Sequence, residues 1–312
     1  MTKERLEVKI YKIGIWPVLY MLISMLTQYI AMGILCVKDF IAMGENQWVG
    51  VDEALSLGER FEAIYNQNSS FISLVSICLT LPVLFYFFVK EERTRRHAVS
   101  LYKPYQYGWI VILGFSACVG FSRFVSLLPF DKIGQSYAQV EQELFNKVFW
   151  VQLAVICLLV PIAEEFIYRG MVYKRLREYM PKEGSILVSA LIFGVFHFNA
   201  MQGLYAFGIG ILCAYVYEKY GNLLAAMVLH ISANSFSVFL NKTGISSFFS
   251  KNIVIYLLFM CIELAICGGV FYYIACKMPD FKTDSDKNKQ EIKQEQAIQS
   301  EEEKQSTFDI YG

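Results

Sequence analysis

Long apolar stretches alternate with short charged segments along this chain of 312 residues. A helix needs about 20 apolar residues to cross the hydrocarbon core of a bilayer. The pattern therefore predicts an all-α fold, a polytopic transmembrane helical bundle of about eight spans. We expect these spans over residues 14–37, 69–89, 106–130, 148–172, 184–199, 201–217, 222–241 and 252–276.

The fifth and sixth stretches are short, and only a tight connection at residues 199–203 separates them. They are either two spans or a re-entrant pair, and two spans fit the charge distribution better. Lys and Arg gather in the N-terminal segment and after the second and fourth stretches, and cations in short loops mark the cytoplasmic side. Eight spans with both termini in the cytoplasm satisfy this alternation throughout.

The chain divides into four parts on this interpretation. Residues 1–147 hold N-terminal transmembrane helices and loops, 148–241 a set of core helices, and 242–276 the final span. Residues 277–312 contain too few apolar side chains to fold, which predicts a disordered cytoplasmic tail. In the loop after the first span, apolar residues recur at helical spacing around residues 51–65 and predict a short amphipathic helix.

Composition supports a membrane protein. Apolar residues make up 55% of the chain and charged residues only 18%, which is too apolar for a soluble domain of this size. The formal net charge is zero, so no basic field suggests a nucleic-acid partner, and the expected environment is the lipid bilayer. The eight cysteines form no CxxC pair and lie within or at the edge of apolar stretches, as small buried hydrophobes do. The polar start and the long first apolar run do not fit a cleavable signal peptide.

Three groups of polar or ionisable residues stand out inside the expected spans, where such side chains are costly and usually mark a site or pathway. They are Glu164, Glu165 and Arg169 in the fourth span, His197 at the end of the fifth, and His230 and Asn234 in the seventh. From a helix rise of about 1.5 Å per residue, Glu164 lies roughly 15 Å and His230 roughly 12 Å from the cytoplasmic edge, with His197 at most about 22 Å deep. We therefore expect the three groups to meet at one level in the bilayer.

Helical spacing separates the two adjacent glutamates. Glu165 and Arg169 are four residues apart and can pair on their own helix, whereas Glu164 points about 100° away and is left free to act. His230 and Asn234 are also four apart and share one helical face. The remaining histidine, His97, sits beside two arginines in a loop and is expected to be solvated.

These residue types suit the activation of a water molecule. Glu164 can accept the proton of the water, His197 can hold the same water, and His230 with Asn234 can stabilise an oxyanion. The absence of an HExxH motif excludes a conventional zincin. Glu164, His197 and His230 also match a three-ligand zinc set with an open position, so the cofactor is either zinc or none.

Three motifs carry a resemblance to a known family. They are Glu164-Glu165-x-x-x-Arg169, Phe193-x-x-x-His197 and His230-x-x-x-Asn234. In this order on membrane spans they resemble the CAAX-prenyl-protease and bacteriocin-processing (CPBP, or Abi) family of intramembrane proteases, over residues 148–241.

The resemblance implies an intramembrane endopeptidase that hydrolyses membrane-associated or lipidated peptides and proteins. It further implies that Glu164 and His197 activate the water, that His230 and Asn234 serve the oxyanion, and that Glu165 and Arg169 support the site. Both a metal-dependent and a glutamate-activated mechanism are attached to the family. Without eukaryotic targeting features, the chain is more similar to bacterial members, which implies a place in the bacterial cytoplasmic membrane.

Two other functions stay open at this point. The same fold can serve as a non-catalytic scaffold, an immunity protein or a sensor-binding protein. A proton-coupled transporter is disfavoured because the chain shows no inverted repeat. The substrate and the oligomeric state are not determined, although Gly203, Gly208 and Gly210 favour close helix packing within one chain over dimerisation.

Overall fold

The computed structural model describes residues 6–43, 53–93, 102–128 and 148–278, and the regular elements in these ranges are all helices. Seven of them are long and apolar enough to cross a membrane, which confirms the predicted all-α polytopic bundle. The candidate spans are Glu7–Asp39, Phe61–Glu91, Pro104–Ser126, Phe149–Tyr179, Ala200–Tyr220, Leu223–Thr243 and Ile253–Lys277.

The fourth span is one helical rod built of five segments. These are α5 (Phe149–Gln152), the π-helix η2 (Leu153–Leu159), α6 (Val160–Glu165), the π-helix η3 (Phe166–Tyr173) and α7 (Lys174–Tyr179). The other helices are α1 (Leu6–Met43), α2 (Glu53–Arg93), α3 (Pro104–Ser126), α8 (Lys182–Val195), α9 (Ala200–Tyr220), α10 (Leu223–Thr243), α11 (Ile245–Ser250) and α12 (Ile253–Lys277).

The fifth expected span is shorter than predicted. Helix α8 has 14 residues, which corresponds to about 21 Å and falls short of a bilayer core. It packs against α9 as a close hairpin, because a Cβ at Gly194 would lie only 2.6 Å from the carbonyl oxygen of Gly203. Asn199 starts α9, since its side chain accepts hydrogen bonds from the backbone N–H groups of Met201 and Gln202. The membrane side on which each terminus lies stays a prediction.

The region after the first span also differs from expectation. Instead of a separate short amphipathic helix around residues 51–65, α2 begins at Glu53 and continues without interruption to Arg93. Residues 51 and 52 lie outside the described residues, as do His97 and residues 279–312 of the predicted tail.

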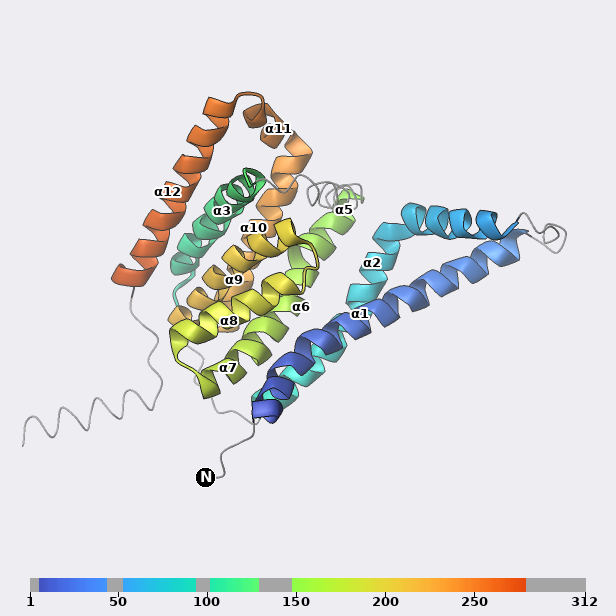
Figure 1. The fold of residues 1–312 in the computed structure, drawn as a ribbon, viewed down its shortest axis with the longest axis horizontal. Coiled ribbons are helices and arrows are strands. Elements are labelled where there is room, and N and C mark those ends of the chain that lie inside the picture. Colours follow the sequence, from blue (N-terminus) through green and yellow to red (C-terminus); the bar gives the residue numbers. More distant parts are fainter. Residues whose placement is uncertain (1–5, 44–52, 94–101, 129–147, 279–312) are drawn as a thin grey trace, which may run out of the picture.

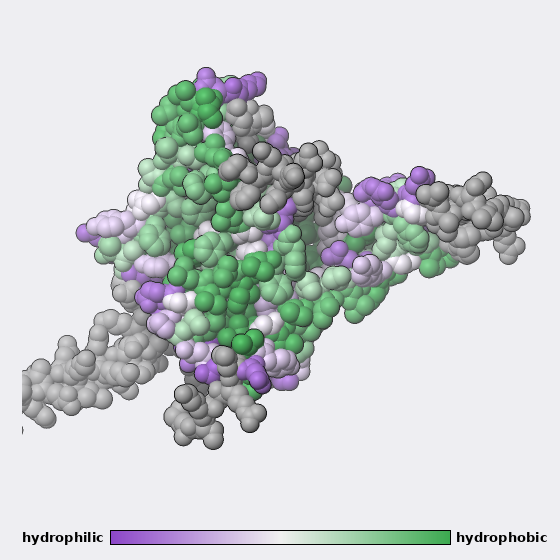
Figure 2. All heavy atoms as spheres, viewed as in Figure 1, coloured by the Kyte–Doolittle hydropathy of each residue, from purple (hydrophilic) through white to green (hydrophobic). Residues whose placement is uncertain are grey.

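Helices α1 and α2 form a long hairpin beside the bundle of the other helices (Figure 1). Hydroxyl groups join the two helices, with Thr27 Oγ1 lying 2.8 Å from Ser76 Oγ. At the end of the hairpin nearest α7, Glu91 pairs with Arg175, and this ion pair ties the hairpin to the bundle. Figure 2 shows broad apolar surfaces across the middle of the molecule and polar residues concentrated towards its ends, as expected for a protein surrounded by lipid.

Candidate active site

The two π-helical segments flank α6, the segment that carries both glutamates. In a π-helix each backbone N–H bonds to the carbonyl five residues earlier, and the N–H of Val160 does so to Val155. The next bond would run from residue 161 to Ile156, but Pro161 has no N–H to donate. The carbonyl of Ile156 therefore receives no hydrogen bond from residue 161. Instead, the side-chain Nδ2 of Asn234 donates to it at 2.9 Å.

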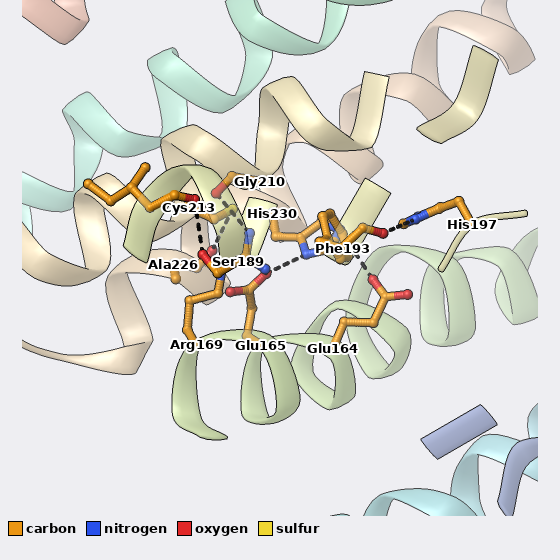
Figure 3. Close-up of polar contacts among 11 residues, drawn as sticks. Glu164, Glu165, Arg169, Ser189, Phe193, His197, Gly210, Cys213, Ala226 and His230 are labelled. Carbon is orange, nitrogen blue, oxygen red and sulfur yellow. Dashed lines mark hydrogen bonds and ion pairs between the residues drawn. The ribbon is translucent and has the colours of Figure 1, made fainter. Parts of the chain in front are cut away.

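Glu165 joins the fourth span to α10 through one carboxylate oxygen, and Arg169 extends the connection to α9. Its Oε1 accepts from Arg169 Nη1 at 2.7 Å and from His230 Nδ1 at 2.8 Å (Figure 3). Arg169 also donates from Nη2 to the carbonyl of Gly210 on α9 at 3.1 Å. Glu165 and Arg169 are 0% and 1% exposed, so the cluster is fully buried. The predicted pairing of Glu165 with Arg169 is confirmed, and its extension to His230 and Gly210 is new.

Glu164 lies in a different environment from its neighbour. Its side chain is 14% exposed, and its Oε2 faces His230 Nε2 at 3.6 Å. His230 thus stands between the two glutamates, with Nδ1 towards the buried one and Nε2 towards the open one (Figure 3). Since the Glu165 carboxylate can only accept, the hydrogen on Nδ1 belongs to His230.

His197 reaches the site from the tip of the α8–α9 hairpin. Its Nδ1 donates to the carbonyl of Phe193 at 2.8 Å, which leaves Nε2 as the free ring nitrogen. The Phe193 ring lies edge-on to both imidazoles, at 4.8 Å from His197 and 5.6 Å from His230. The guanidinium of Arg169 sits over the same ring at 4.9 Å. Phe193 therefore separates the two histidines and fixes their orientation.

A cavity of about 490 Å³ brings the predicted residues together. This volume lies within the range of small-ligand pockets. Four of the six candidates line the cavity, whereas Glu165 and Arg169 lie behind its wall. The lining candidates are Glu164, His197, His230 and Asn234. Helices α1 and α2 supply another wall, which motif reading did not anticipate.

Two of the three expected zinc ligands, Glu164 and His230, lie at a distance that fits a zinc ion, but His197 does not complete a set of three ligand atoms within 4.8 Å of one another. The 3.6 Å between His230 Nε2 and Glu164 Oε2 suits two ligands of one tetrahedral metal. His197 and His230 also each donate from Nδ1 to an oxygen, as histidines that bind a metal through Nε2 commonly do.

Among the described residues, three donors do come within ligand distance of one another, namely Glu165, Cys213 and His230, whose atoms lie within 4.8 Å of one another. In this group Glu165 Oε1 already accepts from His230 and from the positively charged Arg169. A metal ion would have to approach that guanidinium closely. We therefore assign no metal to this group, and Cys213 remains a small buried residue of the core.

Sequence reasoning missed two contributors to the site. The Gly210 carbonyl binds Arg169, and a Cβ at Gly210 would lie 3.1 Å from Ala190, so glycine permits the approach of the two helices. Tyr20 on α1 lines the cavity, and nothing in its local sequence separates it from the other tyrosines. The Gly208-Ile209-Gly210 pattern was a usable signal of close packing.

One family model matches the chain. Residues 146–236 match the family described as type II CAAX prenyl endopeptidase Rce1-like. The matched segment contains all six candidate residues and agrees with the resemblance drawn from the three motifs. It supports a membrane-embedded protease of the CAAX type in general terms. No curated protein and no solved structure matches the chain.

Proposed function

We propose that the protein is an intramembrane endopeptidase that hydrolyses peptide bonds of membrane-associated or lipidated substrates. The observation that carries the proposal is the pairing of Glu164 with His230 across 3.6 Å at the wall of a cavity of about 490 Å³. A carboxylate and two imidazoles in one cavity, on helices long enough to cross a bilayer, suit hydrolysis within the membrane.

Glu164 acts as the general base in this proposal. It takes a proton from a water molecule that His197 holds through its free Nε2, and the resulting hydroxide attacks the peptide carbonyl. Glu164 then gives the proton to the leaving amine as the carbon–nitrogen bond breaks. Its partly open position lets it reach the water, whereas the fully buried Glu165 is unable to do so.

His230 and Asn234 stabilise the oxyanion. The Asn234 amide carries two N–H bonds, and Ile156 uses one of them, so the second is free to serve the cavity. His230 can donate from Nε2 when both of its ring nitrogens carry a hydrogen. The positive charges of His230 and Arg169 and the negative charges of the two glutamates then sum to zero. Donors fixed in place before the reaction give the largest stabilisation in a site of low dielectric constant.

Glu165 and Arg169 are positioning residues. They hold the His230 ring by a charged hydrogen bond and anchor it to α9 through Gly210. Glu164, His197 and His230 would hold a zinc ion together only if His197 moved closer to the other two, and the ion would then supply a Lewis acid to polarise the carbonyl. Metal analysis of the purified protein distinguishes the zinc form from the metal-free one.

The substrate class follows from the matched family and the position of the cavity. The family description names CAAX prenyl endopeptidases, so a prenylated C-terminal peptide is the first substrate to test. We place the protein in a bacterial cytoplasmic membrane because the chain carries no eukaryotic targeting features, and the distribution of Lys and Arg supports a cytoplasmic position for both termini.

The test uses purified protein in lipid nanodiscs with a farnesylated CAAX peptide and an unlipidated amphipathic peptide, and mass spectrometry detects the products. Wild type should cleave at least one peptide, and Glu164→Gln should cleave neither while keeping its thermal transition. Glu178→Gln is the matched control, because Glu178 forms an exposed ion pair with Arg175 outside the cavity. Cleavage by Glu164→Gln at the wild-type rate would refute the proposal.

A further inference from the structure

Helix α1 carries a row of three polar side chains on the face that lines the cavity. Tyr20, Ser24 and Gln28 are spaced four residues apart and share one side of the helix. The surrounding span is apolar, with a mean hydropathy of 1.8. Polar groups inside an apolar span are costly unless they contact water, protein or a ligand. The position of these three side chains at the cavity therefore needs an explanation.

The two hydroxyls that join α1 to α2 beside this wall have structural partners. Ser76 lines the cavity as well, but its Oγ bonds to Thr27 Oγ1 at 2.8 Å and lies 3.3 Å from the carbonyl of Ser24. Thr27 itself donates to the backbone of its own helix. These groups hold α1 to α2, which means that α1 is fixed in place beside the cavity.

The three residues of the row are placed differently. The Gln28 side chain is exposed and forms no hydrogen bond with any part of the chain that the structure describes. Tyr20 and Ser24 line the same cavity as Glu164, and α1 packs against η3, the segment that directly follows the two glutamates. The row therefore begins beside the proposed general base and ends at an amide with open donors and acceptors.

We propose that Tyr20, Ser24 and Gln28 bind the backbone of the substrate peptide and hold it extended beside Glu164. A peptide that enters a membrane cavity carries N–H and C=O groups that cost free energy when left unpaired. Hydroxyl and carboxamide groups both donate and accept, so the row can satisfy either backbone group. The inference rests on the proposed function and adds a substrate-binding surface outside the matched residues 146–236.

The length of the row sets the length of peptide that it can hold. Eight residues of helix from Tyr20 to Gln28 span about 12 Å. An extended chain rises about 3.3 Å per residue, so the row matches three to four residues of substrate. Because backbone groups are common to all sequences, this surface sets the conformation and length of the bound peptide rather than its side chains.

The test measures binding of a fluorescent tetrapeptide to the Glu164→Gln protein in nanodiscs, which removes turnover from the measurement. Tyr20→Phe, Ser24→Ala and Gln28→Leu, each added to this background, should weaken binding about 3- to 10-fold, as expected for one lost hydrogen bond. The matched control is Tyr29→Phe, since Tyr29 is 70% exposed on the same helix and does not line the cavity. It should leave the affinity unchanged.

A peptide with one backbone N–H replaced by an ester oxygen separates binding from a structural effect. The ester should weaken binding to the parent protein and should weaken it less in the row variant that has lost its partner. Unchanged affinity in all three row variants, or equal ester effects in every protein, would overturn the inference.

Turnover separates the failure of this inference from failure of the proposed function. In the active protein, the row variants should raise KM and leave kcat nearly unchanged. If wild type cleaves and the row variants keep the wild-type KM, the row does not bind the substrate, but the proposed protease function is unaffected. If Glu164→Gln cleaves normally, the proposed function fails, and the binding measurement still decides whether the row holds a peptide.

Discussion

His230 Nδ1 lies 2.8 Å from Glu165 Oε1, and the same oxygen receives a hydrogen bond from Arg169 at 2.7 Å. This relationship joins α10 to the fourth span through one buried carboxylate. It also determines which ring nitrogen of His230 faces Glu164, because the Nδ1 hydrogen is committed to Glu165. The general base and the oxyanion donor of the proposed reaction therefore depend on a residue that never contacts the substrate.

Removing Arg169 should destabilise the fold strongly. In Arg169→Met the Glu165 carboxylate stays buried without its counter-charge, and we expect a loss of about 3–5 kcal/mol of unfolding free energy. The double variant Arg169→Met/Glu165→Gln should lose less than the single variant, because no uncompensated carboxylate remains. Unfolding in mixed micelles monitors both, and a double variant less stable than Arg169→Met would contradict this account.

Asn234 should be required for turnover more than for substrate binding. Asn234→Ala removes an oxyanion donor, and we expect kcat to fall about 10²- to 10³-fold with little change in KM. Asn234→Asp has nearly the same shape but no donor in its ionised form, so it should be equally impaired. Steady-state kinetics on the cleaved peptide test both, and a fully active Asn234→Asp would exclude the role.

Pro161 should determine how much Asn234 contributes to stability. In Pro161→Ala the new N–H can bond to the Ile156 carbonyl and replace the Asn234 amide there. Asn234→Ala should then cost about 1 kcal/mol in the wild-type background and less in the Pro161→Ala background. A double-mutant cycle of thermal stabilities measures the difference, and equal losses in both backgrounds would show that the two sites are independent.

The convergence of the motifs could be predicted from the sequence, because the depth of a residue in the bilayer follows from its position along its own helix. A fixed rise per residue placed Glu164 and His230 at similar levels, and spacing of four paired Glu165 with Arg169. Spacing within one helix carries no information on partners from another helix. The bond from Glu165 to His230 therefore needed the structure.

The length of α8 and the contribution of α1 to the cavity wall could not be predicted from the sequence. Hydropathy counts apolar residues and does not show where a helix ends, so the stretch to residue 199 looked like a span although the helix stops at Val195. The chain has 20 tyrosines, and only the packing of α1 against η3 distinguishes Tyr20. The π-helical segments break the 3.6-residue period that sequence patterns assume, and Pro161 was the only local sign of them.

The close approach of α8 and α9 should be necessary for activity. In Gly194→Ala the added Cβ would lie 2.6 Å from the Gly203 carbonyl, so the hairpin must separate and its tip, which carries His197, must move. We expect a lower melting temperature and at least a tenfold loss of kcat. Gly268→Ala on α12 is the matched control, because its Cβ would meet nothing within 4 Å, and it should behave as wild type. An active and stable Gly194→Ala protein would show that the position of His197 does not depend on this contact.

The most direct test of the central claim is a single-turnover cleavage in oxygen-18 water, with enzyme in excess over a membrane-embedded peptide. If Glu164 activates a water molecule, the new carboxylate of the product gains one heavy oxygen in the first turnover, and Glu164→Gln yields no product. A first-turnover product without the heavy oxygen would mean that a carboxylate of the enzyme attacks the peptide carbonyl to form an anhydride, which water then opens at the enzyme's own carboxyl carbon so that the product keeps the enzyme's unlabelled oxygen. Labelled product from Glu164→Gln at the wild-type rate would remove Glu164 from the reaction altogether.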